Sequence, residues 1–213
     1  MPFSSQNGKD TIKWIIERVS HETAIDVGVG SGTYAKLFPD IKMDGIEIYE
    51  PYIEKYGLKD IYQNIYVEDV RSWKPEKQYD IAFLGDVVEH MTIGQAQDVI
   101  KKMRECAKTV IISVPIGYYP QEEFEGNPYE RHVVDNYSVD LFIDRFGEPS
   151  YKVVDGEIGV FVYSEEKIRP KICVYAISKN EEMFVERFID AASEADEIFI
   201  SDTGSIDKTC TVA

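Results

Sequence analysis

The sequence is poor in residues that mark several large classes of protein. It has only 3 cysteines among 213 residues, and their scattered positions predict neither a disulfide framework nor a cysteine metal site. No apolar run approaches the roughly 20 residues that span a bilayer, and the first residues, MPFSSQNGKDTIKW, do not resemble a secretory signal. We therefore expect reduced thiols, a cytoplasmic location and no membrane partner.

Positive charge is also scarce. The formal net charge is −16, and the only short basic cluster is IKKMRE. Proteins that bind DNA or RNA need a basic face to displace counterions from phosphates. Nucleic acid is therefore not an expected partner.

Apolar strands and amphipathic helices alternate through the first three quarters of the chain. This alternation predicts a parallel sheet with helices on both faces. A helix follows the fifth strand, and after it comes a hairpin whose two strands are separated by the turn signal DG. The hairpin completes a sheet of about seven strands by Ser164. The five parallel strands are expected in TAIDVGVG, MDGIEI, IYQNIYVEDV, YDIAFLGD and KTVIISVP. The fold class is thus α/β, a doubly wound, Rossmann-like sheet.

A polar, aromatic stretch of 21 residues, IGYYPQEEFEGNPYERHVVDN, separates the fifth strand from the last helix. It is too long for a simple connection, so a functional loop or a lid is expected there.

Three glycines, Gly28, Gly30 and Gly32, follow the first strand and precede a helix. Glycines at this turn let the backbone bend tightly and let a ligand approach where a Cβ would clash. A dinucleotide fingerprint would require another glycine at the position of Thr33. The sequence therefore argues against a nicotinamide or flavin cofactor.

Two carboxylates follow the next two strands. Glu47 ends the second strand, where a carboxylate can accept hydrogen bonds from both hydroxyls of a ribose. Asp69 follows the third strand and could meet the exocyclic amine of an adenine, with Val70 supplying a backbone donor. A turn or helix cap is the alternative role for Asp69.

The segments AIDVGVGSGTYAKLF, GIEIYEPYIEKYG, YVEDVRSW and YDIAFLGDVVEHM resemble successive motifs of the class I S-adenosylmethionine-dependent methyltransferases. The resemblance covers about residues 10–165 and implies S-adenosyl-L-methionine as the cofactor. It implies that Asp26 and the three glycines surround the methionine end of this cofactor. It also implies that Glu47 binds the ribose, that Ile48 flanks the adenine, and that Asp69 with Val70 recognises it.

The same resemblance places Asp86, at the end of the fourth strand, against the methionine moiety or the substrate. Methyl transfer from a sulfonium mainly needs alignment of donor and acceptor, and a base where the acceptor must lose a proton. His90 and His132 are candidate catalytic residues, although His90 can equally be structural.

Candidate substrate residues are Glu89, Tyr129 and Arg131, although the tyrosines of this stretch can instead anchor the loop. The carboxylate cluster of the metal-dependent catechol methyltransferases cannot be assigned, so no metal is expected. A small-molecule or sugar acceptor is expected as the partner.

The last segment, residues 171–213, resembles the first strand, helix and second strand of family-2-type glycosyltransferases, which use nucleotide sugars. In that family the aspartate after the second strand, here Asp202 in SDTGSID, contacts the nucleotide. We expect a methyltransferase domain at 1–165, a linker at 166–170 and a partial glycosyltransferase-like segment that cannot act alone.

Four interpretations of this arrangement remain open. In the first, the chain is the N-terminal part of a bifunctional methyltransferase–glycosyltransferase with a further domain downstream. In the second, the last segment is an accessory extension of the methyltransferase. In the third, the methyltransferase-like part is a catalytically silent scaffold or binding module. In the fourth, the protein is a nucleotide-sugar enzyme regulated by its N-terminal half.

Overall fold

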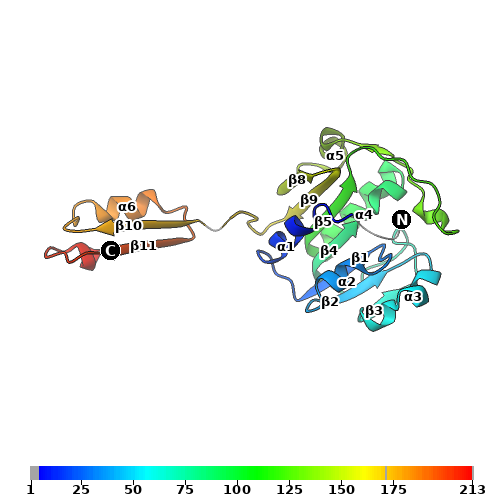
Figure 1. The fold of residues 1–213 in the computed structure, drawn as a ribbon, viewed down its shortest axis with the longest axis horizontal. Coiled ribbons are helices and arrows are strands. Elements are labelled where there is room, and N and C mark those ends of the chain that lie inside the picture. The colour runs from blue at the N-terminus through cyan, green and yellow to red at the C-terminus, as the bar shows by residue number, and fades with distance from the viewer. Residues whose placement is uncertain (1–4, 171, 213) are drawn as a thin grey trace. The chain divides into compact units, whose positions relative to one another are not determined.

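The structure is a computed structural model in which residues 5–170 and 172–212 are described. The chain divides into two compact units, Met1–Ile168 and Arg169–Ala213, called unit 1 and unit 2 (Figure 1). No helix within the described ranges is both long and apolar enough to cross a membrane.

Unit 1 is built on a seven-stranded sheet with the order β3-β2-β1-β4-β5-β9-β8. The first five of these strands are parallel, and the pairings β5–β9 and β9–β8 are antiparallel. The strands are β1 (Thr23–Val27), β2 (Lys42–Ile46), β3 (Asn64–Tyr66), β4 (Tyr79–Gly85), β5 (Ala107–Pro115), β8 (Tyr151–Asp155) and β9 (Ile158–Ser164). The predicted α/β sheet with a closing hairpin is confirmed.

Helices cover both faces of this sheet, because neighbouring strand residues point to opposite sides. Ala82 and Leu84 of β4 join one buried cluster, with α4 (Ile93–Cys106) and α5 (Val139–Phe146). Ile81 and Phe83 join a second cluster, with α1 (Lys9–Ile16), α2 (Thr33–Leu37) and α3 (Pro51–Lys55). Strands buried on both faces explain the near-continuous apolar runs of the sequence.

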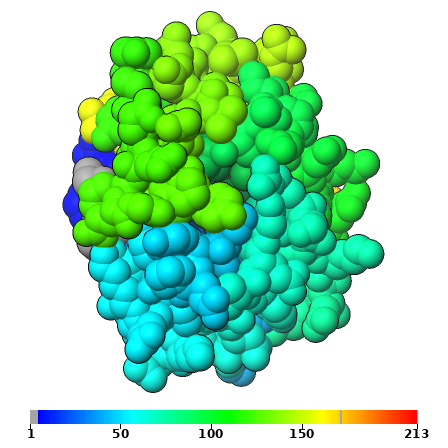
Figure 2. All heavy atoms as spheres, turned by 90° about the vertical axis from the view of Figure 1, so that its right-hand side faces the viewer, coloured from blue at the N-terminus to red at the C-terminus, as the bar shows by residue number. Residues whose placement is uncertain are grey.

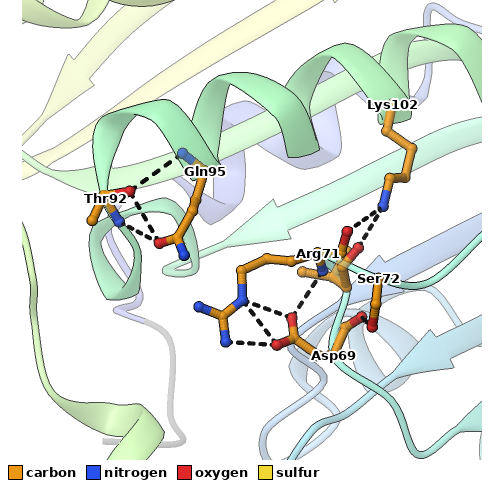
Figure 3. Close-up of polar contacts among 7 residues, drawn as sticks. Asp69, Arg71, Ser72, Thr92, Gln95 and Lys102 are labelled. Atoms are coloured by element: carbon orange, nitrogen blue, oxygen red, sulfur yellow. Dashed lines mark hydrogen bonds and ion pairs between the residues drawn. The ribbon is translucent and has the colours of Figure 1, made fainter.

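The helix α4 begins at a capping box. The Thr92 side chain accepts a hydrogen bond from the backbone of Gln95, and the Gln95 side chain accepts one from the backbone of Thr92 (Figure 3). These bonds satisfy donors that a helix N-terminus leaves without partners. The cap thereby determines where α4 begins.

The long stretch after β5 is ordered by a small sheet that the sequence did not reveal. In it β6 (Gly117–Tyr118) pairs antiparallel with β7 (Asn136–Tyr137). Short helical turns η1 (Leu58–Asp60), η2 (Val88–His90) and η3 (Pro128–Glu130) complete unit 1. Figure 2 shows the stretch, in green, lying against the cyan segment that contains α3. Two side-chain contacts join them, Tyr52 with Glu130 and Lys55 with Glu125.

Unit 2 is a βαβ unit followed by a short helix. Its parallel strands β10 (Cys173–Ser178) and β11 (Glu197–Asp202) flank α6 (Val185–Ala191), and α7 (Thr209–Val212) follows. On one face of this two-stranded sheet Tyr175, Ile177 and Phe199 are more than half exposed. This apolar face has no cover within the described residues of unit 2.

We predict that Phe161→Ala lowers the free energy of unfolding by about 3–5 kcal/mol, the usual cost of removing a fully buried phenylalanine. Phe161 of β9 is 0% exposed, and its ring stacks on that of Phe142 of α5 at a centroid distance of 3.8 Å. Val154→Ala, on the neighbouring strand and 45% exposed, is the control. Urea unfolding measures both, and equal losses would contradict the packing described.

Candidate functional site

A pocket opens where β1, β2 and β4 end. The order of the parallel strands reverses between β1 and β4, so the connections leave that edge in opposite directions and a crevice forms between them. The inner wall of the pocket includes Gly28, Gly30, Glu47, Ile48, Gly85 and Asp86. Its outer part includes Asp69, Val70, Arg71, His90, Met91 and Tyr129. Most of the residues predicted as cofactor ligands thus meet in one place.

The glycine turn after β1 requires glycine for steric reasons. Gly28 has φ +68°, and a Cβ there would lie 2.8 Å from Cγ2 of Val87. Gly32 has φ +78°, and a Cβ there would lie 2.6 Å from Cδ1 of Ile61. Both positions combine a left-handed backbone with a close neighbour. Gly28 lines the pocket, whereas Gly32 packs behind it at the start of α2.

Glu47 joins the glycine turn to the end of β2. Its Oε2 accepts a hydrogen bond from the N–H of Gly30 at 2.9 Å, and its Oε1 accepts one from the N–H of Tyr49 at 2.8 Å. The side chain is 4% exposed, and this burial raises its pKa, while hydrogen bonds from the backbone N–H groups of Tyr49, Gly30 and Ile48 oppose the rise. A carboxylate can accept about four hydrogen bonds. Glu47, which lines the pocket, therefore keeps acceptor capacity for a ligand there.

Asp26 is buried in β1 behind the pocket and does not line it. The hydroxyl of Tyr62 donates a hydrogen bond to its Oδ2 at 2.5 Å. Burial raises the pKa of Asp26 to about 7, and the Tyr62 hydrogen bond and the charge of Lys9 oppose this rise. The structure thus places Asp26 in contact with Tyr62 and outside the residues that line the pocket.

A buried lysine that sequence reasoning missed lies beside this group. Lys9 is 5% exposed, and its Nζ donates to the hydroxyl of Tyr34 at 3.0 Å, which in turn bonds Oγ of Ser113. Burial lowers the pKa of Lys9, and the charges of Asp86 and Asp26 oppose this. The only sequence signal was its position in the first turn of an apolar helix. Tyr34 lines the pocket and therefore connects this network to it.

The Tyr34 ring also depends on Gly85, the last residue of β4. A Cβ at Gly85 would lie 2.3 Å from Cε2 of Tyr34. The ring stacks on Phe83 at 4.5 Å. Asp86 follows with φ +56°, a conformation uncommon for a residue other than glycine. At the end of β4, where it faces the pocket, the backbone thus needs a residue without a side chain at Gly85 and adopts a left-handed conformation at Asp86.

Asp69 has a partner that the sequence analysis did not foresee. Its carboxylate accepts hydrogen bonds from Nε and Nη2 of the Arg71 side chain at 2.6–2.9 Å and from the Arg71 backbone N–H (Figure 3). These bonds occupy most of its acceptor positions and lower its pKa. Lys102 of α4 donates to the carbonyl of Val70 at 2.7 Å and so holds the same loop (Figure 3). In this geometry the oxygens of Asp69 are bonded to Arg71, so the Arg71 guanidinium is the polar group available to a ligand at this side of the pocket.

The residues after β4 bring two histidines together. His90 lines the pocket, and its ring centroid lies 4.9 Å from that of His132. Glu89 is 1% exposed, and its backbone carbonyl accepts the N–H groups of Val133 and Val134. These bonds hold the later segment against η2. Burial lowers the pKa of His90 to about 4 and also lowers that of His132, so both rings are neutral at pH 7.

The remaining candidates differ in position. Tyr129 lines the pocket and is 46% exposed. The side chain of Arg131 forms ion pairs with Glu122 at 3.1 Å and Glu123 at 3.5 Å on the surface and does not line the pocket. Asp202, in unit 2, is exposed and accepts hydrogen bonds from Gly204 and Ser205 of its own loop. The Ser205 bonds are the main reason why its pKa is lowered.

Solved methyltransferase structures share this fold. A S-adenosylmethionine-dependent methyltransferase from Clostridium acetobutylicum ATCC 824 matches with a TM-score of 0.57 and 12% identity, over 72% of this chain and 89% of that chain. The methyltransferase domain of bacterial CtHen1 matches with a TM-score of 0.56 and 18% identity, over 75% of this chain and 98% of that chain.

The N-terminal domain of EvdMO1 with SAH bound matches with a TM-score of 0.54 and 12% identity, over 75% of this chain and 80% of that chain. No protein-family model matches the sequence, and no curated protein matches it significantly. At these identities the likeness shows the fold, which is the Rossmann-like methyltransferase fold.

We predict that the buried Asp26 makes the protein less stable as the pH rises from about 4 to about 7. Its folded pKa of about 7 lies above the ordinary value of 3.8, so in this window the folded state holds a proton that the unfolded state releases. Each unit of pKa difference is worth about 1.4 kcal/mol. Urea unfolding of the wild type and Asp26→Asn across this range measures the effect.

Asp10→Asn is the matched control, because the side chain of Asp10 is 97% exposed. The free energy of unfolding of the wild type minus that of Asp26→Asn should decrease as the pH rises. The same difference between the wild type and Asp10→Asn should stay nearly constant. A pH-independent difference for Asp26→Asn would show that this carboxylate titrates normally.

Proposed function

We propose that unit 1 is a S-adenosylmethionine-dependent methyltransferase that acts on a small molecule or a glycan component. The observation that carries the proposal is Glu47, a buried carboxylate that lines the pocket and is hydrogen-bonded to Gly30 of the glycine turn, which lines the same pocket. A ribose with two adjacent hydroxyls fits such a carboxylate. Structures with the same fold were solved with SAH bound, among them PigF and the N-terminal domain of EvdMO1.

The cofactor would lie along the ends of β1, β2 and β4. Gly28 and Gly30 would leave room for its methionine end, Glu47 would accept the ribose hydroxyls, and Ile48 would pack against the base. Asp69 fits its expected role only if the Arg71 side chain turns away, because Arg71 occupies the carboxylate. Stacking of the base on the guanidinium of Arg71 is the arrangement that needs the least change.

When bound, the cofactor would supply an activated methyl group on a sulfonium. The protein then has to align an acceptor and to help it lose a proton. His90 and Tyr129 line the pocket on its outer side, where an acceptor would enter. The neutral ring of His90, with a pKa of about 4, is a weak base toward a hydroxyl. Solved structures of the same fold that are named as O-methyltransferases favour a hydroxyl acceptor.

Isothermal titration with S-adenosylhomocysteine tests this proposal. We expect the wild type to bind, and Glu47→Gln to bind about 5- to 150-fold more weakly, because hydrogen bonds worth 1–3 kcal/mol are lost. Glu50→Gln, an exposed residue that does not line the pocket, should bind like the wild type. A folded wild type that binds neither S-adenosylmethionine nor S-adenosylhomocysteine would instead favour a catalytically silent scaffold.

For unit 2 we propose a role as the first part of a larger α/β domain of glycosyltransferase type, which would make the protein bifunctional. The support is the apolar face formed by Tyr175, Ile177 and Phe199, which a two-stranded sheet leaves exposed. Exposed apolar groups of this size usually mark a contact surface. The resemblance of SDTGSID to a nucleotide-binding turn gives the glycosyltransferase type.

We predict that the double variant Tyr175→Ser/Phe199→Ser binds less of the dye ANS than the wild type does, because the two rings form the centre of this face. Glu197→Ser, on the same face of β11, is the control and should leave the ANS fluorescence nearly unchanged. Equal fluorescence of the double variant and the wild type would show that the face is covered in this chain.

A further inference from the structure

We propose that Glu89, His90 and His132 form a binding site for one divalent first-row transition-metal ion, beside the cofactor pocket. One carboxylate oxygen and one ring nitrogen from each histidine lie within 4.8 Å of one another. An ion placed between them would have one oxygen and two nitrogen ligands. This ligand set suits manganese, iron, cobalt or zinc better than magnesium or calcium, which prefer oxygen alone.

The strongest sign of a missing ligand is the Glu89 side chain. It is 1% exposed, and neither of its oxygens has a hydrogen-bond partner among the described residues. A buried carboxylate without partners is costly in any state. Protonation would remove the charge but would leave a donor and an acceptor unsatisfied. A bound cation would neutralise the negative charge of Glu89 and would give a carboxylate oxygen a partner.

The two imidazoles are oriented as metal ligands usually are. Nδ1 of His90 lies 3.1 Å from the carbonyl oxygen of Arg131, and Nδ1 of His132 lies 2.6 Å from that of Tyr119. A carbonyl only accepts, so each Nδ1 carries the hydrogen. In a neutral ring Nε2 then has the free lone pair. Metal-binding histidines are commonly held by such a bond from the second nitrogen.

The fold explains why His132 meets Glu89 and His90, which lie 43 and 42 positions earlier in the chain. The N–H groups of Val133 and Val134 donate to the carbonyl of Glu89 at 2.8 and 3.0 Å. These two bonds place His132 next to η2, while the backbone of the same turn directs His90 toward the pocket. The carboxylates of Asp86 and Glu130 add negative charge around Glu89. The local field therefore favours a cation.

A site with three protein ligands leaves positions open for a water or a substrate oxygen. If the proposed methyltransferase function holds, the ion would bind the hydroxyl of the acceptor and lower its pKa, so that the proton passes to solvent. The resulting oxygen would attack the methyl carbon, the carbon–sulfur bond would break, and S-adenosylhomocysteine would leave as a neutral thioether. Acceptors with hydroxyl groups able to bind a metal are thus the expected substrate class.

Cobalt(II) titrated into the full chain without any cofactor tests the site directly, with visible absorption and calorimetry as readouts. We expect one ion per chain. Glu89→Gln and His132→Ala should each weaken binding by more than about 100-fold, beyond the roughly 10–100-fold that loss of an outer partner costs. His21→Ala removes the third histidine, which is exposed, and should bind like the wild type. Cys173→Ser/Cys210→Ser, which removes the two exposed thiols, should also bind like the wild type.

A wild type without a 1:1 cobalt site, or a Glu89→Gln variant that binds as tightly, would overturn the proposal. Loss of binding in His21→Ala or in the cysteine variant would do the same. Magnesium at equal concentration should bind far more weakly, and equal affinity would contradict the assigned ligand set.

Thermal unfolding gives a second readout that does not require the variant to bind anything. Without metal, Glu89→Gln should melt at or above the wild-type temperature, because it removes a buried charge. With cobalt, only the wild type should gain stability. An equal gain in both would overturn the proposal. Because S-adenosylhomocysteine binding is measured separately, failure of the metal site and failure of the methyltransferase proposal can be told apart.

Discussion

The hydrogen bond from Gly30 to Glu47 is the interaction on which the pocket depends. It joins the turn after β1 to the residue after β2, so two strand ends are held at a defined separation. Ile46 reinforces the junction, because its carbonyl accepts the N–H of Gly28 at 2.9 Å. The inner wall is therefore formed before any ligand arrives. Preorganisation of this kind lowers the cost of binding.

Buried carboxylates lie in the pocket wall at Glu47 and outside the lining residues at Asp26 and Glu89, and this burial has a cost in stability. Burial raises the pKa of Asp26, Glu47 and Glu89, which means that each would be more stable exposed to water at neutral pH. Asp26 and Glu47 are partly compensated by Tyr62 and by backbone N–H groups. The side-chain oxygens of Glu89 have no hydrogen-bond partner among the described residues. Perturbed groups gathered at one pocket are typical of functional sites.

Much of the fold and of the inner wall could be predicted because their signals are local. Apolar runs, the glycine turn and a carboxylate at the end of the next strand are each visible within a few residues. The positions of Gly28, Glu47 and Asp86 at one sheet edge then follow from parallel topology.

The parts that could not be predicted depend on long-range contacts. The approach of His132 to Glu89 and His90 is set by backbone bonds across the loop, and no spacing in the sequence reveals them. The burial of Lys9 depends on packing against Tyr34. Arg71 and Asp69 are close in sequence, but only the side-chain geometry shows that the Arg71 guanidinium occupies the carboxylate expected to bind the adenine.

A crystal structure of the chain grown with S-adenosylhomocysteine tests the central claim most directly. The account predicts ligand density along the ends of β1, β2 and β4, with the ribose hydroxyls on Glu47 and the amino acid end beside Gly28 and Gly30. Density at another place, or a pocket that stays free of ligand at saturating concentration, would contradict it.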